Sequence, residues 1–280
     1  MVLRQKLIAV YAIFRARLKV YTRYPGWLVL SFIFPIFTTL LPVFLAVGVS
    51  GSLEAASNAF WRYSGTREFI FYMLVGSTIW SISVNIIWDF GMWLYEEMEA
   101  GTLEQVLLTP VGVSELLLGA VLYTITITML TSIIGLFIAS TIFGYIGYLI
   151  SKEFIIALLI VVLGFIPLLG MSVFFGALVL KIKEPWSFFN FLTAFLVFIA
   201  GVFYPITVLP PIARYIAVLF PATIQIADAR AVLMHIDYIF DPAIDILILL
   251  SYAIFWPIFG AVMFKRTESE LKLKGSIGAH

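Results

Sequence analysis

Carboxylate side chains gather in one short stretch of the sequence, residues 95–117, which reads YEEMEAGTLEQVLLTPVGVSELL. We call this stretch the acidic segment. It contains Glu96, Glu97, Glu99, Glu104 and Glu115 but neither Lys nor Arg, and long apolar runs lie on both sides of it. Carboxylates can act as general acids or bases, hold metal ions or contact a basic surface. The rest of the sequence must decide between these uses.

The sequence lacks the other groups that catalytic or metal-binding carboxylates need. It has no cysteine and only two histidines, His235 and His280, so it excludes thiolate chemistry, a Cys-ligated metal and a histidine-rich site. The apolar runs contain no paired carboxylates, histidine cluster or cysteine, and an intramembrane enzyme would need such a group. We therefore predict no catalytic residue and no metal site.

Composition places the chain in a membrane. Hydrophobic residues make up 62% of the 280 residues and charged residues only 12%, whereas a soluble domain has roughly half apolar and about a quarter charged residues. One aqueous core could not bury this much apolar surface. The predicted fold class is therefore an all-α polytopic membrane protein.

Apolar runs without charge mark the membrane spans, because a helix needs about 20 apolar residues to cross a bilayer. The run 116–151 is too long for one span, so we divide it near Gly144 and Gly147. The six predicted transmembrane helices cover residues 27–49, 69–88, 116–143, 154–180, 186–204 and 246–264.

A basic amphipathic helix precedes the first span. Its apolar face consists of Leu3, Leu7, Val10, Phe14, Leu18 and Tyr21, and Arg4, Arg15, Lys19 and Arg23 lie away from that face. This pattern is typical of a helix in the membrane interface. It could serve as a topology anchor or as a lever that touches a partner. Most Lys and Arg residues outside the spans fall on the side that holds both termini, so we predict that both termini and the acidic segment are cytoplasmic.

Prolines interrupt the apolar segment before the last span, residues 203–234. Its run 215–227 is too short to cross a bilayer and suits a re-entrant or interfacial helix. Pro211 can occupy the first turn of one short helix, and Pro221 can separate it from a second. Irregular backbone at membrane depth must be covered by protein or water. We therefore expect this outer segment to line or cap a pathway.

Helix signals divide the acidic segment itself. Gly101 suits the end of the preceding helix. Thr102 and Gln105 have the spacing of a capping box that opens a new helix, and Pro110 prevents that helix from extending much further. A helix of about two turns is marginal alone in water. It therefore needs a partner for its apolar side, either this chain or another subunit.

Two sequence runs resemble the ABC-2 type transporter permeases. The run Glu99-x-Gly101-Thr102-Leu103-Glu104-Gln105-Val106-Leu107-Leu108-Thr109-Pro110-Val111 is similar to that family's signature. The later run Phe203-Tyr204-Pro205, Leu209-Pro210, Pro221 and Arg230 more loosely resembles the family's segment before its last span. The basic N-terminal helix, the six spans and the cytoplasmic termini match as well, so the resemblance extends over essentially the whole chain.

The resemblance implies partners and a role. Members of the family pair two permeases with two cytoplasmic ATPase subunits, so we expect two copies of an ABC ATPase, a second permease copy as a homodimer, membrane lipid and no nucleic acid. The sequence contains no G-x-x-x-x-G-K-[ST] loop. ATP and Mg²⁺ would therefore be bound by the ATPase, and this chain would carry no cofactor and would not be an enzyme. The expected function is the permease subunit of an ATP-driven exporter in a prokaryotic plasma membrane.

The resemblance also assigns residues. The loop between the second and third spans would provide a coupling helix that inserts into the ATPase, with Glu96, Glu97, Glu99, Thr102, Leu103, Glu104, Leu107 and Leu108 as contacts. The short outer helices would shape an external gate that includes Pro205, Pro210, Pro221 and Arg230. The resulting organisation is an interfacial helix at 1–24, a six-span domain at 25–266 with the coupling loop at 94–115 and gate helices at 205–240, and a cytoplasmic tail at 267–280.

An ion-gradient-driven secondary transporter is the alternative function. That class tends to need ionisable residues near the membrane centre, often in repeated halves. Here the middle of each span is nearly free of charge, and no repeat is visible. Of the polar residues near the spans, Asp89 is expected to have a helix-end role. Arg230 is expected to contact a lipid headgroup unless the gate role implied by the family holds.

Overall fold

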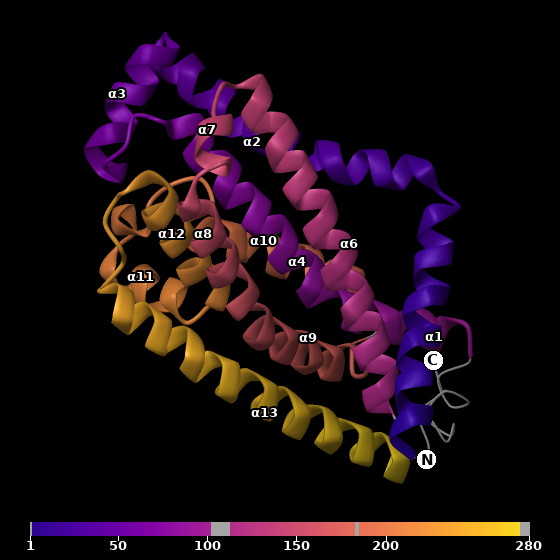
Figure 1. Cartoon of the computed structure of the whole chain (residues 1–280). Helices are drawn as coiled ribbons and strands as arrows, with labels where there is room; N and C mark the ends of the chain where they lie inside the picture. Colours follow the sequence, from indigo (N-terminus) through magenta and orange to yellow (C-terminus); the bar gives the residue numbers. More distant parts are fainter. Residues whose placement is uncertain (1, 102–112, 183–184, 275–280) are drawn as a thin grey trace.

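Helices form nearly all of the computed structural model, which describes residues 2–101, 113–182 and 185–274 (Figure 1). No strand occurs in these residues, so the all-α prediction is confirmed. The helices are α1 (Val2–Thr22), α2 (Pro25–Ser50), α3 (Leu53–Ser64), α4 (Phe69–Glu99), α6 (Val113–Ile142), α7 (Ile146–Leu149), α8 (Lys152–Leu163), α9 (Phe165–Val179), α10 (Pro185–Ile199), the 3₁₀ turn η1 (Ile206–Val208), α11 (Pro211–Val218), α12 (Pro221–Met234) and α13 (Pro242–Lys274).

Within the described residues, five stretches are long and apolar enough to cross a membrane. They are Val29–Ser50, Phe69–Glu99, Leu118–Ile142, Lys152–Val179 and Pro242–Glu270, and the bent pair of α11 and α12 could count as a sixth. The chain is thus a multi-pass membrane protein. The predicted fifth span, 186–204, is not among these stretches, because α10 has only 15 residues and ends at Ile199, and Gly201 then takes a positive φ of 69°.

Two prolines before α13 start helices, as the sequence pattern predicts. Pro211 is the first residue of α11 and Pro221 the first residue of α12. Proline suits this position because its missing N–H is not needed in the first helical turn. The two helices are bent by 95° at the break between them. This sharp bend makes α11 and α12 a folded-back unit rather than a straight span.

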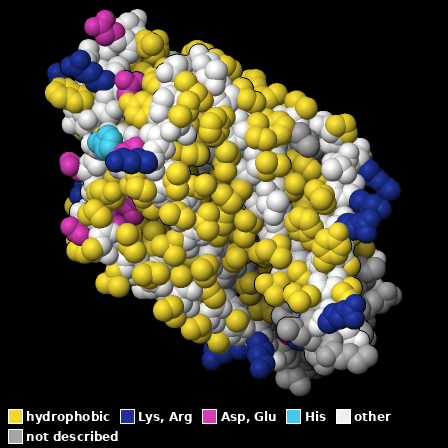
Figure 2. Space-filling model, viewed as in Figure 1, with side chains coloured by type: hydrophobic (Ala, Val, Ile, Leu, Met, Phe, Trp, Pro, Cys, Tyr) yellow, Lys and Arg dark blue, Asp and Glu magenta, His cyan; other side chains and the backbone are white. Residues whose placement is uncertain are grey.

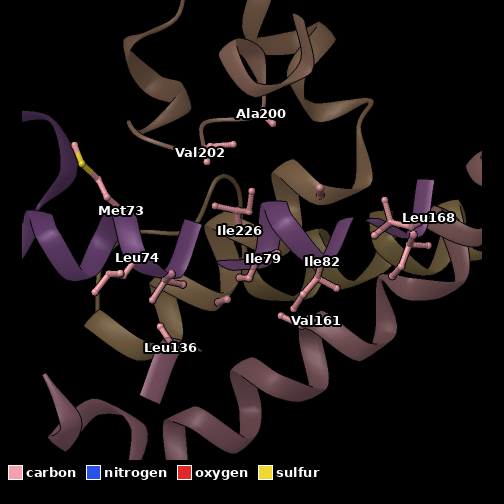
Figure 3. Packing of buried hydrophobic residues seen from close by; sticks show 14 of the residues in the cluster. Met73, Leu74, Ile79, Ile82, Leu136, Val161, Leu168, Ala200, Val202 and Ile226 are labelled. Carbon is pink, nitrogen blue, oxygen red and sulfur yellow. The ribbon is translucent and has the colours of Figure 1, made fainter. Parts of the chain in front are cut away.

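The long helix α4 lies at the centre of the fold. Its side chains Leu74, Ile79 and Ile82 are buried among residues from α6, α8, α9 and α12, including Leu136 and Val161 (Figure 3). Most of α4 is buried, whereas only 12% of the apolar stretch in α2 and 11% of that in α13 is buried. Helices α2 and α13 therefore present most of their apolar surface outward.

One end of the molecule gathers several element termini. Figure 1 places the start of α1, the start of α6 and the end of α13 at the same end, and α3, α7, α11 and α12 at the opposite end. Hydrophobic side chains cover the middle of the face in Figure 2, and charged side chains lie toward its edges. This distribution suits a molecule with an apolar belt and two polar ends.

Candidate functional site

Three glutamates predicted to contact a partner lie in the last turns of α4. Glu97 accepts a hydrogen bond from Trp93 Nε1 at 3.2 Å, and Glu99 accepts one from the Tyr95 hydroxyl. Both are contacts between residues four apart, which face each other on a helix. Glu96 is exposed beside them. The end of α4 therefore presents carboxylates whose positions are partly set by neighbouring aromatic side chains.

Helix α4 ends next to Gly101, as the sequence predicted. α4 stops at Glu99, and Gly101 follows with a positive φ of 66° and an N–H that bonds Met98 O at 3.0 Å. The other residues predicted to contact a partner lie outside the described residues; they are Thr102, Leu103, Glu104, Leu107 and Leu108. The two-turn helix predicted for the acidic segment lies there as well and stays a prediction.

An ion pair joins α1 to α4 two turns before these glutamates. Arg17 Nη1 donates to Asp89 Oδ1 at 2.8 Å, and both side chains are largely buried. Tyr123 of α6 lies under the pair, with the Arg17 guanidinium 5.9 Å from its ring centroid. The helix-end role expected for Asp89 misses this partner, which lies 72 residues away in the sequence.

The sequence held a signal for this pair. Arg17 lies three residues after Phe14 and four before Tyr21, so it interrupts the apolar face of the N-terminal helix. Phe14 and Tyr21 both pack edge-on against Tyr123. A cation within a packed face requires a buried or half-buried partner. The identity of that partner could not be read from the pattern.

The N-terminal helix also packs closely on α6. A Cβ added at Gly119 of α6 would lie 2.7 Å from Val10 O and 2.9 Å from the Ile13 side chain. Only glycine permits this approach between the two helices. Through Gly119 and the Arg17–Asp89 pair, α1 is attached to the two helices that flank the acidic segment.

Arg230 lies in a second polar site, on α12. It is 1% exposed, and its guanidinium donates to three backbone carbonyls, those of Tyr72, Gly201 and Val202. The guanidinium also lies over the Tyr72 ring, 3.6 Å from its centroid. The headgroup contact considered for Arg230 is therefore wrong, because the side chain is enclosed by protein. It instead connects α12, α4 and the turn after α10.

The predicted gate prolines are distributed along this part of the chain. Pro205 precedes η1, Pro210 precedes α11 and Pro221 begins α12. Pro221 is buried, whereas Pro210 is exposed. Arg230 therefore lies in the core, and the three prolines lie at the starts of η1, α11 and α12.

A third polar contact lies just outside the predicted spans. Asp228 of α12 belongs to the outer segment and Asp245 of α13 directly precedes the predicted sixth span, and the two buried carboxyl groups lie close together. The sequence could not reveal this pair because the two residues belong to different helices. Among the described residues, no group of three or more His, Asp or Glu side chains could hold a metal ion.

Comparison with known proteins gives the family. A family model described as ABC-2 type transporter matches residues 8–234, which is most of the chain. The matched region contains α4, the acidic segment, Arg17, Asp89 and Arg230. No curated protein matches the chain.

Proposed function

Because the chain belongs to the ABC-2 type transporter family, we propose that it is the permease subunit of an ATP-driven exporter that binds a separate ATPase through the acidic segment. The family assignment makes the chain a membrane subunit of an ABC transporter. The finer proposal adds export, ATP as the energy source, two permease copies and two ATPase copies. The observation that carries it is the family match across residues 8–234, which includes the whole acidic segment.

The geometry at the end of α4 supports the proposed site. Glu96, Glu97 and Glu99 lie in the last turns of one continuous helix, and the ion pair between Arg17 and Asp89 attaches that helix to α1. A displacement imposed on the acidic segment would therefore reach α4, α1 and α6 together. Carboxylates at the rim of an interface favour a partner with basic residues at matching positions.

We expect charge reversal in the acidic segment to release the ATPase. In the complex of this chain with its ABC ATPase, Glu97→Lys together with Glu104→Lys, or Leu107→Asp alone, should sharply reduce co-purification and ATP-dependent export. Two controls separate charge from fold. Trp93→Phe removes the hydrogen bond to Glu97 but keeps its charge, and Glu54→Lys reverses a charge on α3 at the opposite end.

Intact binding and transport in these variants would overturn the proposal. If the reversed variants bind the ATPase and transport as well as the unaltered chain, the acidic segment is not the coupling site. Transport that continues without ATP and collapses with the ion gradient would instead establish the secondary-transporter alternative.

A further inference from the structure

Two aspartates meet where α12 packs against α13. Asp228 lies in α12 and Asp245 in the first turn of α13, and they are 1% and 0% exposed. Their carboxyl groups lie close enough to form a hydrogen bond with each other once one of them carries a proton. The apolar side chains Ile224 and Leu249, four residues from each aspartate on the same helices, are fully buried between the helices.

The surroundings provide little compensation for two negative charges. Phe240 N–H donates to Asp245 Oδ2 at 3.3 Å, but Oδ1 of Asp228 and Oδ1 of Asp245 are buried without a hydrogen-bond partner. Arg230 is near Asp228 in sequence, yet its guanidinium is directed to Tyr72, Gly201 and Val202. No ion pair to either aspartate occurs within residues 2–101, 113–182 and 185–270.

The other titratable groups that act on the pair are acidic. Asp241, in the loop before α13, adds a negative charge near Asp245. Burial, followed by the charges of Asp228 and Asp245, raises the pKa of Tyr238 in the same loop, so this phenol stays neutral. The environment therefore disfavours two carboxylate ions at this position.

Hydrogen-bond chemistry then determines the protonation state. An ionised carboxylate only accepts hydrogen bonds, whereas a protonated carboxyl group carries one O–H donor. Two ionised carboxylates cannot hydrogen-bond each other, because neither has a donor, and two neighbouring negative charges repel. We propose that Asp228 and Asp245 share one proton at neutral pH and that this proton holds α12 against α13.

The proton makes the contact between the helices dependent on pH. When the carboxyl group releases its proton to water at higher pH, the O–H donor is lost and two buried anions face each other. The contact should then weaken, and the folded-back unit of α11 and α12 should separate more readily from α13. Asp228→Asn provides an amide N–H donor that does not titrate, so it should keep the contact at every pH.

Infrared spectroscopy can detect the proton directly. We expect the purified chain in lipid vesicles at neutral pH to show the carbonyl stretch of a protonated carboxyl group. This band should be lost in Asp228→Asn and in Asp245→Asn, and it should remain in Asp241→Asn, which alters an exposed neighbour. Absence of the band in the unaltered chain, or a band that neither Asp228→Asn nor Asp245→Asn changes, would overturn the proposal.

Cysteine labelling can test the consequence for the helix interface, because the chain has no native cysteine. Leu249→Cys places a thiol in the buried interface one turn from Asp245, and Thr207→Cys places one at an exposed reference position. Dividing the labelling rate at position 249 by the rate at position 207 removes the effect that pH has on the reactivity of any thiol. This ratio should rise several-fold between mildly acidic and mildly alkaline pH, and Asp228→Asn should abolish the rise. A ratio that stays constant in the unaltered background, or rises equally with Asp228→Asn, would contradict a proton-held contact.

Discussion

The buried guanidinium of Arg230 connects three segments of the protein. The guanidinium satisfies carbonyls from α4 and from the turn after α10 while its own helix is α12. The planar fork of arginine suits several acceptors and can also stack on an aromatic ring. Gly76 makes room for it, since a Cβ there would lie 1.8 Å from Arg230 Nη2.

Arg230→Lys should therefore destabilise the protein although it keeps the charge. A lysine ammonium cannot reach the same three carbonyls and cover the Tyr72 ring, so we expect a loss of about 2–4 kcal/mol, the scale for breaking a buried charged network. Thermal unfolding in detergent would measure it. The control is Arg214→Lys, whose arginine donates to Thr207 O and Leu209 O near the surface. A similar small effect of both changes would contradict this role for Arg230.

The Arg17–Asp89 pair allows a charge exchange. Arg17→Glu or Asp89→Lys alone should loosen α1 from α4, because each places two like charges together in a largely buried position. The double variant should recover most of the lost thermal stability and most of the ATPase binding proposed above. If it is no better than the single variants, the pair does not act as an interacting unit.

At the scale of elements, the break between α8 and α9 is held by a neighbour. Gln225 of α12 donates from Nε2 to Val161 O at 2.8 Å, and its amide occupies the space beside Gly164. A Cβ at Gly164 would lie 1.8 Å from that nitrogen. Gln225 therefore links the break between α8 and α9 to the position of the folded-back unit of α11 and α12.

Gly164→Ala should force Gln225 out of its place. We expect a destabilisation of about 1–3 kcal/mol, typical of overpacking a tight site. Gly48→Ala is the matched control, because nothing lies within 4 Å of the added methyl group on α2. In Gln225→Ala the effect of Gly164→Ala should largely vanish. An undiminished effect would show that the strain arises elsewhere.

For the whole molecule, burial is divided unevenly between the helices. Phe71 on α4 is 0% exposed and stacks on Tyr148, whereas Phe37 on α2 is 66% exposed. The exposed aromatic surface of α2 is available to lipid or to a second copy of the chain. It contributes little to packing within one copy.

Phe71→Ala should accordingly lower stability by about 3–5 kcal/mol, as expected for emptying a packed aromatic site. Phe37→Ala should change the unfolding temperature of the isolated chain in detergent very little. If Phe37→Ala instead destabilises the protein strongly and in a concentration-dependent way, α2 forms an interface between copies under those conditions.

Composition and hydrophobic runs by themselves determined that the chain is an all-α multi-pass membrane protein. Helix signals at Gly101, Gly144, Pro211 and Pro221 located element ends, because proline and glycine act on the backbone within one turn. The motif around the acidic segment indicated the family before the comparison did.

Only the tertiary structure decided which polar groups meet. Arg17 with Asp89, Arg230 with Tyr72 and Asp228 with Asp245 each join different helices. Helical periodicity shows which face a residue lies on, but not which helix will cover that face. A buried charge must find its partner within the folded chain, because lipid offers none. That choice depends on how the helices pack, and it is set only when the whole bundle forms.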